Sequence, residues 1–194
     1  PNSKCLRCHD DAEMRNDAGE SLAVHAAQFD VSAHKRLDCV ECHSAALSTR
    51  HPRNTLGPVS FDACMDCHED EISVFRNSVH AAARRDEPKS CQGCHGSVHT
   101  AVRSTDPTAP MSDLNQVRNC GVCHEEMMEG YLSSVHAKSL FVSGLIEAAP
   151  SCSDCHGSHD ILGQKSPEAR SSHQKSPETC GNCHKGIVEK WAGS

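Results

Sequence analysis

The sequence predicts a mostly irregular fold with short α-helices and little or no β-structure. The 194-residue chain is 37% hydrophobic and only 3% aromatic, so side chains alone cannot easily offset the entropy lost on folding. Apolar residues recur at helical spacing in a few short segments, while the alternating pattern of strands is nearly absent. Polar, proline-containing stretches separate these segments. Something other than side chains must therefore fill the interior.

The cysteines occur in one repeated pattern. All 14 form C-x-x-C pairs, and a histidine directly follows every pair. The pairs are Cys5/Cys8, Cys39/Cys42, Cys64/Cys67, Cys91/Cys94, Cys120/Cys123, Cys152/Cys155 and Cys180/Cys183, followed by His9, His43, His68, His95, His124, His156 and His184. C-x-x-C-H is the attachment signature of c-type haem, in which the thiols bind the vinyl groups and the histidine is the proximal iron ligand. We therefore predict seven covalently attached haem c groups and a haem-packed core.

Three simpler interpretations of the cysteine pairs are weaker. Zinc sites also use C-x-x-C, but they do not require a histidine at one fixed offset, and seven pairs cannot be divided into four-cysteine sites. Small disulfides and redox dithiols are likewise indifferent to the next residue. With 15 histidines in 194 residues, a histidine after all seven pairs has a chance probability of roughly 10⁻⁸.

Three of the motifs begin similar segments, at Cys64, Cys120 and Cys180. Counted from each proximal histidine, offset +4 is apolar, +7 is aromatic, and +11 in two copies is a valine directly before a further histidine. These residues are Ile72, Phe75, Val79 and His80; Met128, Tyr131, Val135 and His136; and Val188 and Trp191. Offsets of 4, 7 and 11 predict one face of a helix. We expect the aromatic residues to pack against porphyrin, in preference to the alternative that they act as electron relays.

A second motif follows each such segment, so the chain divides into two-haem modules. The predicted modules span residues 1–60, 61–115 and 116–179, and residues 180–194 begin a fourth with one haem. The first is a looser copy, with four extra residues before the LAVHA that contains His25. Polar connectors at 48–60, 103–115 and 163–179 join the modules. We expect the natural polypeptide to continue past Ser194, with a histidine two residues beyond it.

Eight histidines outside the motifs are candidate distal ligands. Six recur at matching module positions and two are irregular. The six are His25, His51, His80, His99, His136 and His159, and the two are His34 and His173. His99 and His159 follow proximal His95 and His156 too closely to reach the opposite face of the same iron, so each should bind a different haem. Met14 and Met111 are alternative axial ligands, which would raise a reduction potential.

Charge and hydropathy exclude several classes of partner. The formal net charge of −7 argues against nucleic acid, and no apolar stretch is long enough to span a bilayer. No signal peptide is visible, so we expect that an exported form has lost its leader. With two propionates per haem, the charge becomes about −14 oxidised and about −21 reduced. We predict potentials mostly below that of the hydrogen electrode.

The repeated C-x-x-C-H, the aromatic-x-x-Ser-Val-His-Ala and the C-x-x-C-H-Gly with a trailing histidine resemble multihaem c-type cytochromes of anaerobic and metal-respiring bacteria. The combination is also similar to NapC/NirT-type and cytochrome c554-like proteins. NapC/NirT families carry an N-terminal membrane helix, which is absent here. The resemblance implies anaerobic respiration, and haem attachment of this type places the protein in the periplasm, at the cell surface or outside the cell. It implies redox partner proteins: a quinol-linked donor, other cytochromes or an extracellular acceptor.

We expect an electron-transfer protein and not an enzyme, acting as a soluble conduit, a complex subunit or a filament subunit built as a homo-polymer. The alternative is a multihaem oxidoreductase that acts on nitrite, tetrathionate or hydroxylamine at one haem with an open coordination site. The surplus of histidines and the absence of an atypical motif such as C-x-x-C-K argue against such a site.

Overall fold

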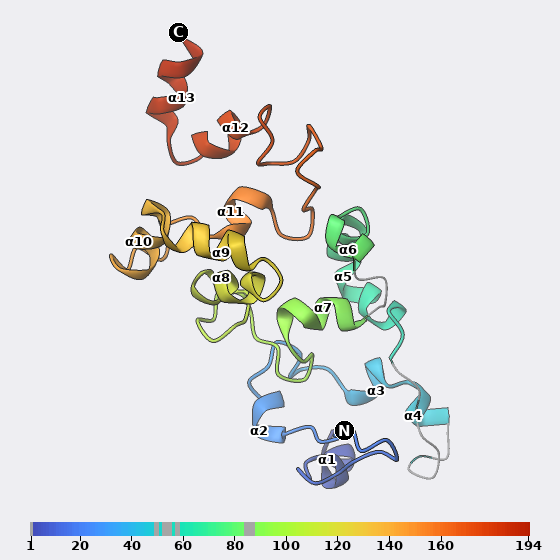
Figure 1. The fold of residues 1–194 in the computed structure, drawn as a ribbon. Helices are drawn as coiled ribbons and strands as arrows, with labels where there is room; N and C mark the ends of the chain where they lie inside the picture. Colours follow the sequence, from blue (N-terminus) through green and yellow to red (C-terminus); the bar gives the residue numbers. More distant parts are fainter. Residues whose placement is uncertain (1, 49–50, 52–55, 57–58, 84–87) are drawn as a thin grey trace. The chain divides into compact units, whose positions relative to one another are not determined.

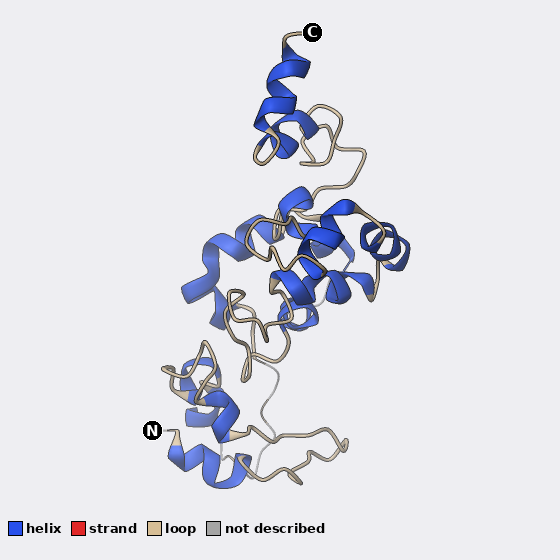
Figure 2. Ribbon diagram, turned by 90° about the vertical axis from the view of Figure 1, so that its left-hand side faces the viewer, coloured by secondary structure: helices blue, strands red, loops and turns tan. Residues whose placement is uncertain are grey.

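A computed structural model describes residues 2–48, 51, 56, 59–83 and 88–194 (Figure 1). These residues form short helices joined by loops and turns, and an isolated bridge between Arg15 and Ser21 is the only β-pairing among them (Figure 2). The helices are α1 Ser3–His9, α2 Ala26–Phe29, α3 Cys39–Cys42, α4 Ala45–Ser48, α5 Asp62–Phe75, α6 Val79–Ala83, α7 Pro88–His95, α8 Asp113–Gly121, α9 Glu125–Leu132, α10 Val135–Phe141, α11 Cys152–His156, α12 Ser176–Gly181 and α13 Lys185–Ala192. The predicted fold class, short helices with little β-structure, is confirmed.

The chain forms two compact units. Unit 1 comprises Pro1–Cys67 and Glu87–Ala109, and unit 2 comprises His68–Asp86 and Pro110–Ser194. The division into two-haem modules is a separate, sequence-based one and stays a prediction. Most of the predicted connector at 48–60 lies outside the described residues.

In each copy of the repeat, the proximal histidine lies between two helical segments, directly before the second. His124 caps α9 with φ −116° and ψ 52°, and His184 caps α13 with φ −101° and ψ 45°. His68 has φ −119° and ψ 33° inside α5, which makes α5 two helices joined at a kink. The same backbone conformation therefore recurs at the same motif position in all three copies.

The two helices on either side of this break pack closely because small residues lie at their contact. A Cβ atom at Gly181 would lie 3.4 Å from Val188 Cγ2, and one at Gly121 would overlap Met128 Sδ. Ile72, the matching residue of α5, is 4% exposed. The apolar residue at offset +4 therefore packs as the helical pattern predicts.

The prediction of one continuous helix through offset +11 is wrong. In the second copy α9 ends at Leu132, and a new helix, α10, begins at Val135. The side chain of Ser134 accepts a hydrogen bond from the backbone N–H of Ala137, which is the usual serine cap of a helix start. Ser78 does the same for Ala81 before α6. The serine of Ser-Val-His-Ala thus starts a second helix, and Val135 is 70% exposed.

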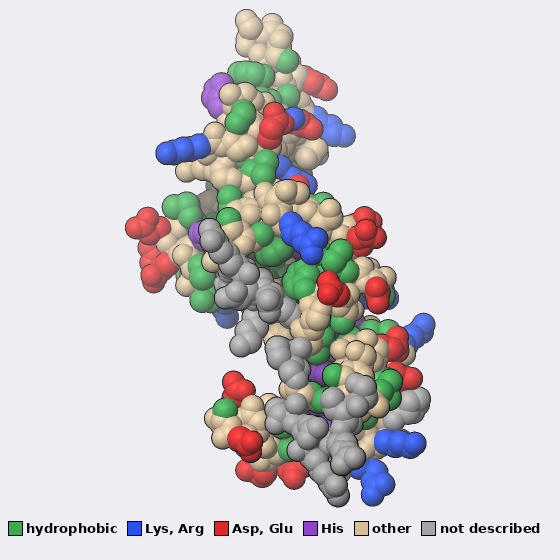
Figure 3. Space-filling view, turned by 90° about the vertical axis from the view of Figure 1, so that its right-hand side faces the viewer, with side chains coloured by type: hydrophobic (Ala, Val, Ile, Leu, Met, Phe, Trp, Pro, Cys, Tyr) green, Lys and Arg blue, Asp and Glu red, His purple; other side chains and the backbone are tan. Residues whose placement is uncertain are grey.

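The side-chain core of the described residues is small. It centres in unit 2 on Val117, Leu140 and Ala149, with Met128 and Tyr131 packed against it. Many large apolar side chains remain exposed instead, and Figure 3 shows hydrophobic side chains and histidines at the surface among charges of both signs. Among the exposed residues are Val122, Val142, Leu47 and Trp191. This agrees with the composition, which is too poor in apolar residues to form a conventional core.

Candidate haem-attachment sites

The helical turns that contain the motifs place both thiols of each pair on one side. Residues i and i+3 of a helix are neighbours on its surface, so the two cysteines of C-x-x-C can reach one edge of a flat group. No disulfide joins any of the 14 cysteines, and none of them is fully buried. This leaves each pair available for two covalent bonds to the same partner.

Five of the seven pairs lie wholly inside one helix: α1, α3, α5, α7 or α11. Cys8 lies near the end of α1 and is exposed, and Cys94 lies near the end of α7 and is half-buried. Burial raises the pKa of Cys91, and the Cys94 thiol raises it further. The two thiols of this pair are therefore close enough to interact, as two bonds to one group require.

The other two pairs extend past the end of their helix. Cys123 and Cys183, both exposed, lie two residues beyond α8 and α12. The backbone N–H of Cys123 donates to the carbonyl oxygen of Cys120 at 3.2 Å, and that of Cys183 donates to Cys180 at 3.2 Å. Each hydrogen bond closes one more tight turn after the helix ends. This turn keeps the second cysteine of the motif near the first.

The thiols of several motifs are accessible at the surface of the polypeptide. Cysteine is among the residue types most often fully buried, yet Cys8 and Cys123 are exposed and Cys94 is only half-buried. The assignment of Cys8, Cys94 and Cys123 to haem attachment, like that of the other eleven cysteines, stays a prediction.

Two of the motif helices begin with a reciprocal cap that the sequence analysis did not find. In α3 the backbone N–H of Asp38 donates to Glu41 at 2.6 Å, and in α11 that of Ser151 donates to Asp154 at 2.7 Å. The capping residue stands just before the first cysteine, and the acidic residue just before the second. The pattern Asp/Ser-x-x-Glu/Asp is a known helix-start signal, and it holds these two motifs in a helical turn.

Four of the seven proximal histidines face a candidate distal histidine. The ring centres of these pairs are 5.9–6.1 Å apart. The pairs are His9 with His51 at 5.9 Å, His43 with His99 at 6.0 Å, His124 with His80 at 6.1 Å and His184 with His136 at 6.0 Å. The first two pairs lie within unit 1 and the last two within unit 2.

This separation fits two imidazoles on opposite sides of one metal ion. An imidazole nitrogen binds a first-row transition metal at about 2.0–2.1 Å, and the ring centre lies about 1 Å behind that nitrogen. Two such rings therefore have centres about 6 Å apart. The donor set at each pair is two thiols, a proximal imidazole and an opposing imidazole, which suits a covalently bound haem with two axial histidines.

Hydrogen bonds at Nδ1 orient two of the histidine rings. His9 Nδ1 lies 2.9 Å from the carbonyl oxygen of Leu22, and His34 Nδ1 lies 3.0 Å from that of Val98. A carbonyl oxygen only accepts, so Nδ1 donates in both, which leaves Nε2 as the nitrogen that could bind a metal. Hydrogen bonds of this kind orient the imidazole ligands of metal sites.

Burial keeps two of the paired histidines neutral. It lowers the pKa of His43 below its ordinary value, and the nearby His9 lowers it further. Burial likewise lowers the pKa of His99, with smaller contributions from His43, His34 and His9. A neutral imidazole is the form that binds metal, so these two rings are ready to act as ligands near pH 7.

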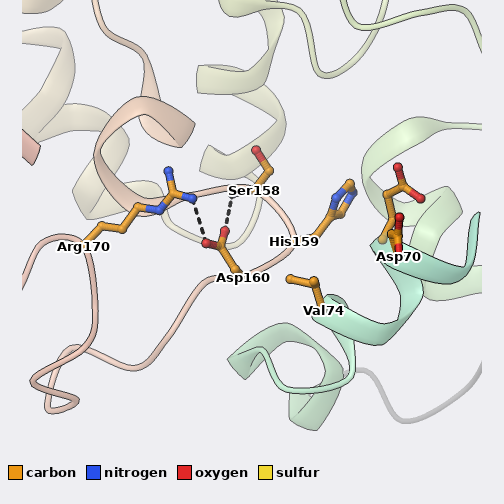
Figure 4. A pocket seen from close by; sticks show the side chains of 7 residues that line it. Asp70, Val74, Ser158, His159, Asp160 and Arg170 are labelled. Carbon is orange, nitrogen blue, oxygen red and sulfur yellow. Dashed lines mark hydrogen bonds and ion pairs between the residues drawn. The ribbon is translucent and has the colours of Figure 1, made fainter. Parts of the chain in front are cut away.

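The loop after α11 presents the trailing histidine His159. It lines a small pocket of about 280 Å³ together with residues of α5 and Arg170. Figure 4 shows His159 pointing toward Asp70, away from Asp160, which pairs with Arg170 at 2.7 Å. The hydrogen bond from Arg170 holds the pKa of Asp160 below its ordinary value. The ion pair therefore fixes the loop at the residue next to the histidine.

The four pairs account for four of the seven motifs. The proximal residues of the other three are His68, His95 and His156, and the remaining distal candidates are His25, His34, His159 and His173. Met111 Sδ accepts a hydrogen bond from Asn119 Nδ2 at 3.0 Å. The hydroxyl of Tyr131 donates to the carbonyl oxygen of Pro150 at 2.8 Å, as a packed tyrosine does.

Two other kinds of feature are absent from the described residues. They contain no group of three or more histidine, cysteine, aspartate or glutamate residues placed to hold a metal ion. None of their helices is long and apolar enough to cross a membrane.

Comparison with known proteins gives one family. A sequence model described as the class III cytochrome c family matches residues 12–124, more than half of the chain. No curated protein and no solved structure matches.

Proposed function

Because the chain belongs to the class III cytochrome c family, a family of multihaem electron-transfer proteins, we propose that it is a heptahaem c-type cytochrome with bis-histidine irons. In this proposal it carries electrons along a series of closely spaced haems, as a conduit, a complex subunit or a filament subunit. The seven C-x-x-C-H motifs provide the haem count, since no cysteine is left over.

The observation that carries the proposal is the recurrence of paired histidines at one separation. We assign the axial pairs His9/His51, His43/His99, His124/His80 and His184/His136 from their ring distances of 5.9–6.1 Å. The remaining proximal histidines take their partners from His25, His34, His159 and His173. Four candidate histidines remain for three irons, so every iron can have a sixth ligand. This favours electron transfer over catalysis at an iron with an open coordination site.

The residues of the chain hold and tune the groups on which this function depends. Haem, when bound, supplies a one-electron redox change at iron. The cysteines would hold each haem covalently and the paired imidazoles would bind its iron, while the hydrogen bond from His9 Nδ1 to the Leu22 carbonyl oxygen orients that ring. Two imidazole ligands favour a low reduction potential relative to a histidine/methionine pair.

We also propose the setting of this electron transfer. Class III multihaem cytochromes are typically periplasmic, and attachment of c-type haem outside the cytoplasm supports either the periplasm or the cell surface. The partners are redox proteins. The resemblance to NapC/NirT-type and cytochrome c554-like proteins, together with a role in anaerobic respiration, favours a quinol-linked donor or another cytochrome on one side and an extracellular acceptor on the other.

A change at His136 tests the proposal. The His136→Ala variant should keep seven haems, counted by their pyridine complexes, and turn one of them from low-spin to high-spin, because the haem on His184 loses its sixth ligand. His136→Met should restore a low-spin iron with a raised potential. Absorption and electron paramagnetic resonance spectra measure both.

The control is Lys138→Ala, which removes an exposed side chain of the same helix and should leave every haem low-spin. Fewer than seven haems in the unchanged protein would contradict the proposed count. An unchanged spin state in His136→Ala would contradict the assigned pair. A stoichiometric high-spin haem in the unchanged protein that binds nitrite would favour the multihaem oxidoreductase instead.

A further inference from the structure

Unit 1 contains a buried hydroxyl group that has no partner in the polypeptide. Ser32 is 2% exposed, and its Oγ atom makes no hydrogen bond to any described residue. A buried polar group without a hydrogen bond costs free energy, so folded proteins seldom contain one. The Ser32 hydroxyl therefore points to a partner outside the polypeptide.

Other buried serines have their partner within the chain. The hydroxyl of Ser172 donates to the carbonyl oxygen of Pro167 at 2.7 Å, and that of Ser151 donates to the Asp154 carboxylate at 2.9 Å. Burial of a serine is thus accompanied by a hydrogen bond at both of these positions. Ser32 differs from them in its partner and not in its burial.

The segment around Ser32 is held against the loop that carries His99. The next backbone N–H after Ser32 donates to the carbonyl oxygen of Ala101 at 2.7 Å, and His34 Nδ1 lies 3.0 Å from the carbonyl oxygen of Val98. These two contacts are made on either side of His99 in the sequence. Ser32 therefore belongs to a segment that supports this histidine.

His99 in turn faces the proximal histidine of the second motif. Its ring centre lies 6.0 Å from that of His43, the separation that fits two ligands of one iron. Ser32 and both histidines belong to unit 1. Of the four assigned pairs, this is the one whose distal histidine is joined to the Ser32 segment by the hydrogen bonds described above. The haem of the second motif is therefore the bound group to which the contacts of Ser32 lead.

Haem c carries the acceptor that a buried hydroxyl needs. Each haem has two propionates, and a hydrogen bond to an ionised carboxylate is stronger than one to a neutral acceptor. Residues 30–36 contain one acidic side chain, Asp30, and two basic ones, Lys35 and Arg36. In a chain with a formal net charge of −7, this locally positive segment also favours a bound carboxylate.

Resting on the proposed function, we propose that the Ser32 hydroxyl donates a hydrogen bond to a propionate of the haem held by the second motif. A donor at this carboxylate partly neutralises its negative charge. Less negative charge near the iron makes its reduction easier, so the hydrogen bond raises the potential of this haem. Ser32 is therefore a positioning residue that tunes one haem of the seven.

The Ser32→Ala variant of the haem-loaded protein tests the proposal. The potential of one haem should fall, and this haem should be the one that His99→Ala turns high-spin. A redox titration followed by nuclear magnetic resonance measures the haems one by one. A propionate bending band in the resonance Raman spectrum should shift in the same variant. Ser32→Thr keeps a hydroxyl group and should restore both signals.

The control is Ser139→Ala in α10, which removes a half-buried hydroxyl that donates to the carbonyl oxygen of Val135 at 3.0 Å. It should leave all seven potentials unchanged.

Seven unchanged potentials in Ser32→Ala would overturn the proposal, because the partner of the hydroxyl would then be an ordered water molecule. A shift at a haem other than the one on His43 would also overturn it. So would an unfolding temperature that stays the same or rises, since the removed hydroxyl would then have had no partner. Each of these results, obtained with seven low-spin haems, contradicts only the inference and leaves the proposed function standing.

Discussion

Gly96 and Gly157 each follow a proximal histidine and adopt a left-handed backbone, with φ of 77° and 85°. Glycine reaches this region without the steric cost that a Cβ atom brings, and it commonly ends helices in this way. The chain therefore turns away from the motif immediately after the histidine. The trailing His99 and His159 are carried away from their own proximal histidine, and His99 lies beside His43 of another motif.

Replacing Gly157 tests the importance of this turn. The Gly157→Ala variant should lose about 2 kcal/mol of stability, because left-handed backbone costs an L-residue about 1–2 kcal/mol. The new Cβ would also overlap the Asp160 carboxylate and lie close to Arg170 Nε. The midpoint of guanidinium unfolding, followed by Soret absorption, measures the loss.

The matched control is Gly130 in α9, where nothing lies within 4 Å of a new Cβ. Gly130→Ala should raise stability by about 0.5–1 kcal/mol, since alanine favours a helix interior. A stable Gly157→Ala variant would mean that the loop before His159 tolerates other conformations.

At the same scale, the sequence could predict the covalent sites but not their axial pairs. The thiols and the proximal histidine of a motif lie within five residues, so local spacing determines their chemistry. His80 and His124, in contrast, meet only through the fold of unit 2. No local sequence pattern predicts the contact between these two histidines. The sequence does limit the possible axial pairs in one way, because a trailing histidine must bind a haem other than that of its own motif.

Among the elements, the break between α9 and α10 has a local cause. Ser134 caps α10 by accepting from the Ala137 N–H at 3.2 Å. Ser134→Ala should destabilise the protein by about 1 kcal/mol, the usual cost of losing a serine cap, and Ser134→Asp should recover most of that loss. Thermal unfolding of both variants measures this, and equal losses in both would show that the cap is unimportant. Ser134 could be seen in the sequence, but the apolar spacing on both sides of it predicted one continuous helix. The serine cap therefore outweighs that spacing.

Gln116 is the polar link between α8 and α11. Gln116→Leu should cost about 1–3 kcal/mol, because the partly buried backbone N–H of Ser153 loses its acceptor, Gln116 Oε1 at 3.0 Å. Gln174→Leu, at an exposed connector position, is the control and should change stability little. Denaturant unfolding compares the two, and equal effects would mean that the hydrogen bond between Ser153 and Gln116 contributes little to stability. A contact made across the fold by a single glutamine has no sequence signature, so this link could not be predicted.

Over the whole molecule, charge sets the direction of the redox properties. The chain carries −7 before haem attachment, and seven haems would bring it to about −14 oxidised and about −21 reduced. The negative charge of such a molecule opposes the addition of electrons. Salt screens this charge, and the screening length falls from about 30 Å at 0.01 M to about 3 Å at 1 M.

We therefore expect midpoint potentials mostly below that of the hydrogen electrode, rising on the order of tens of millivolts between low and high salt. Redox titrations at both ionic strengths measure this. Potentials well above zero, or a fall with added salt, would contradict the charge argument. Composition alone predicts this property, because it depends on total charge and ligand type more than on the arrangement of the sites.

The pairing of His80 with His124, and of His136 with His184, has an evolutionary consequence. In each pair one repeat supplies the first histidine, and the beginning of the following repeat supplies the second. If a gene duplication inserted a further repeat, the new repeat would supply one histidine to the repeat before it and one to the repeat after it. Each iron would then still have two histidine ligands. An array joined in this way lengthens by whole repeats without redesigning those already present.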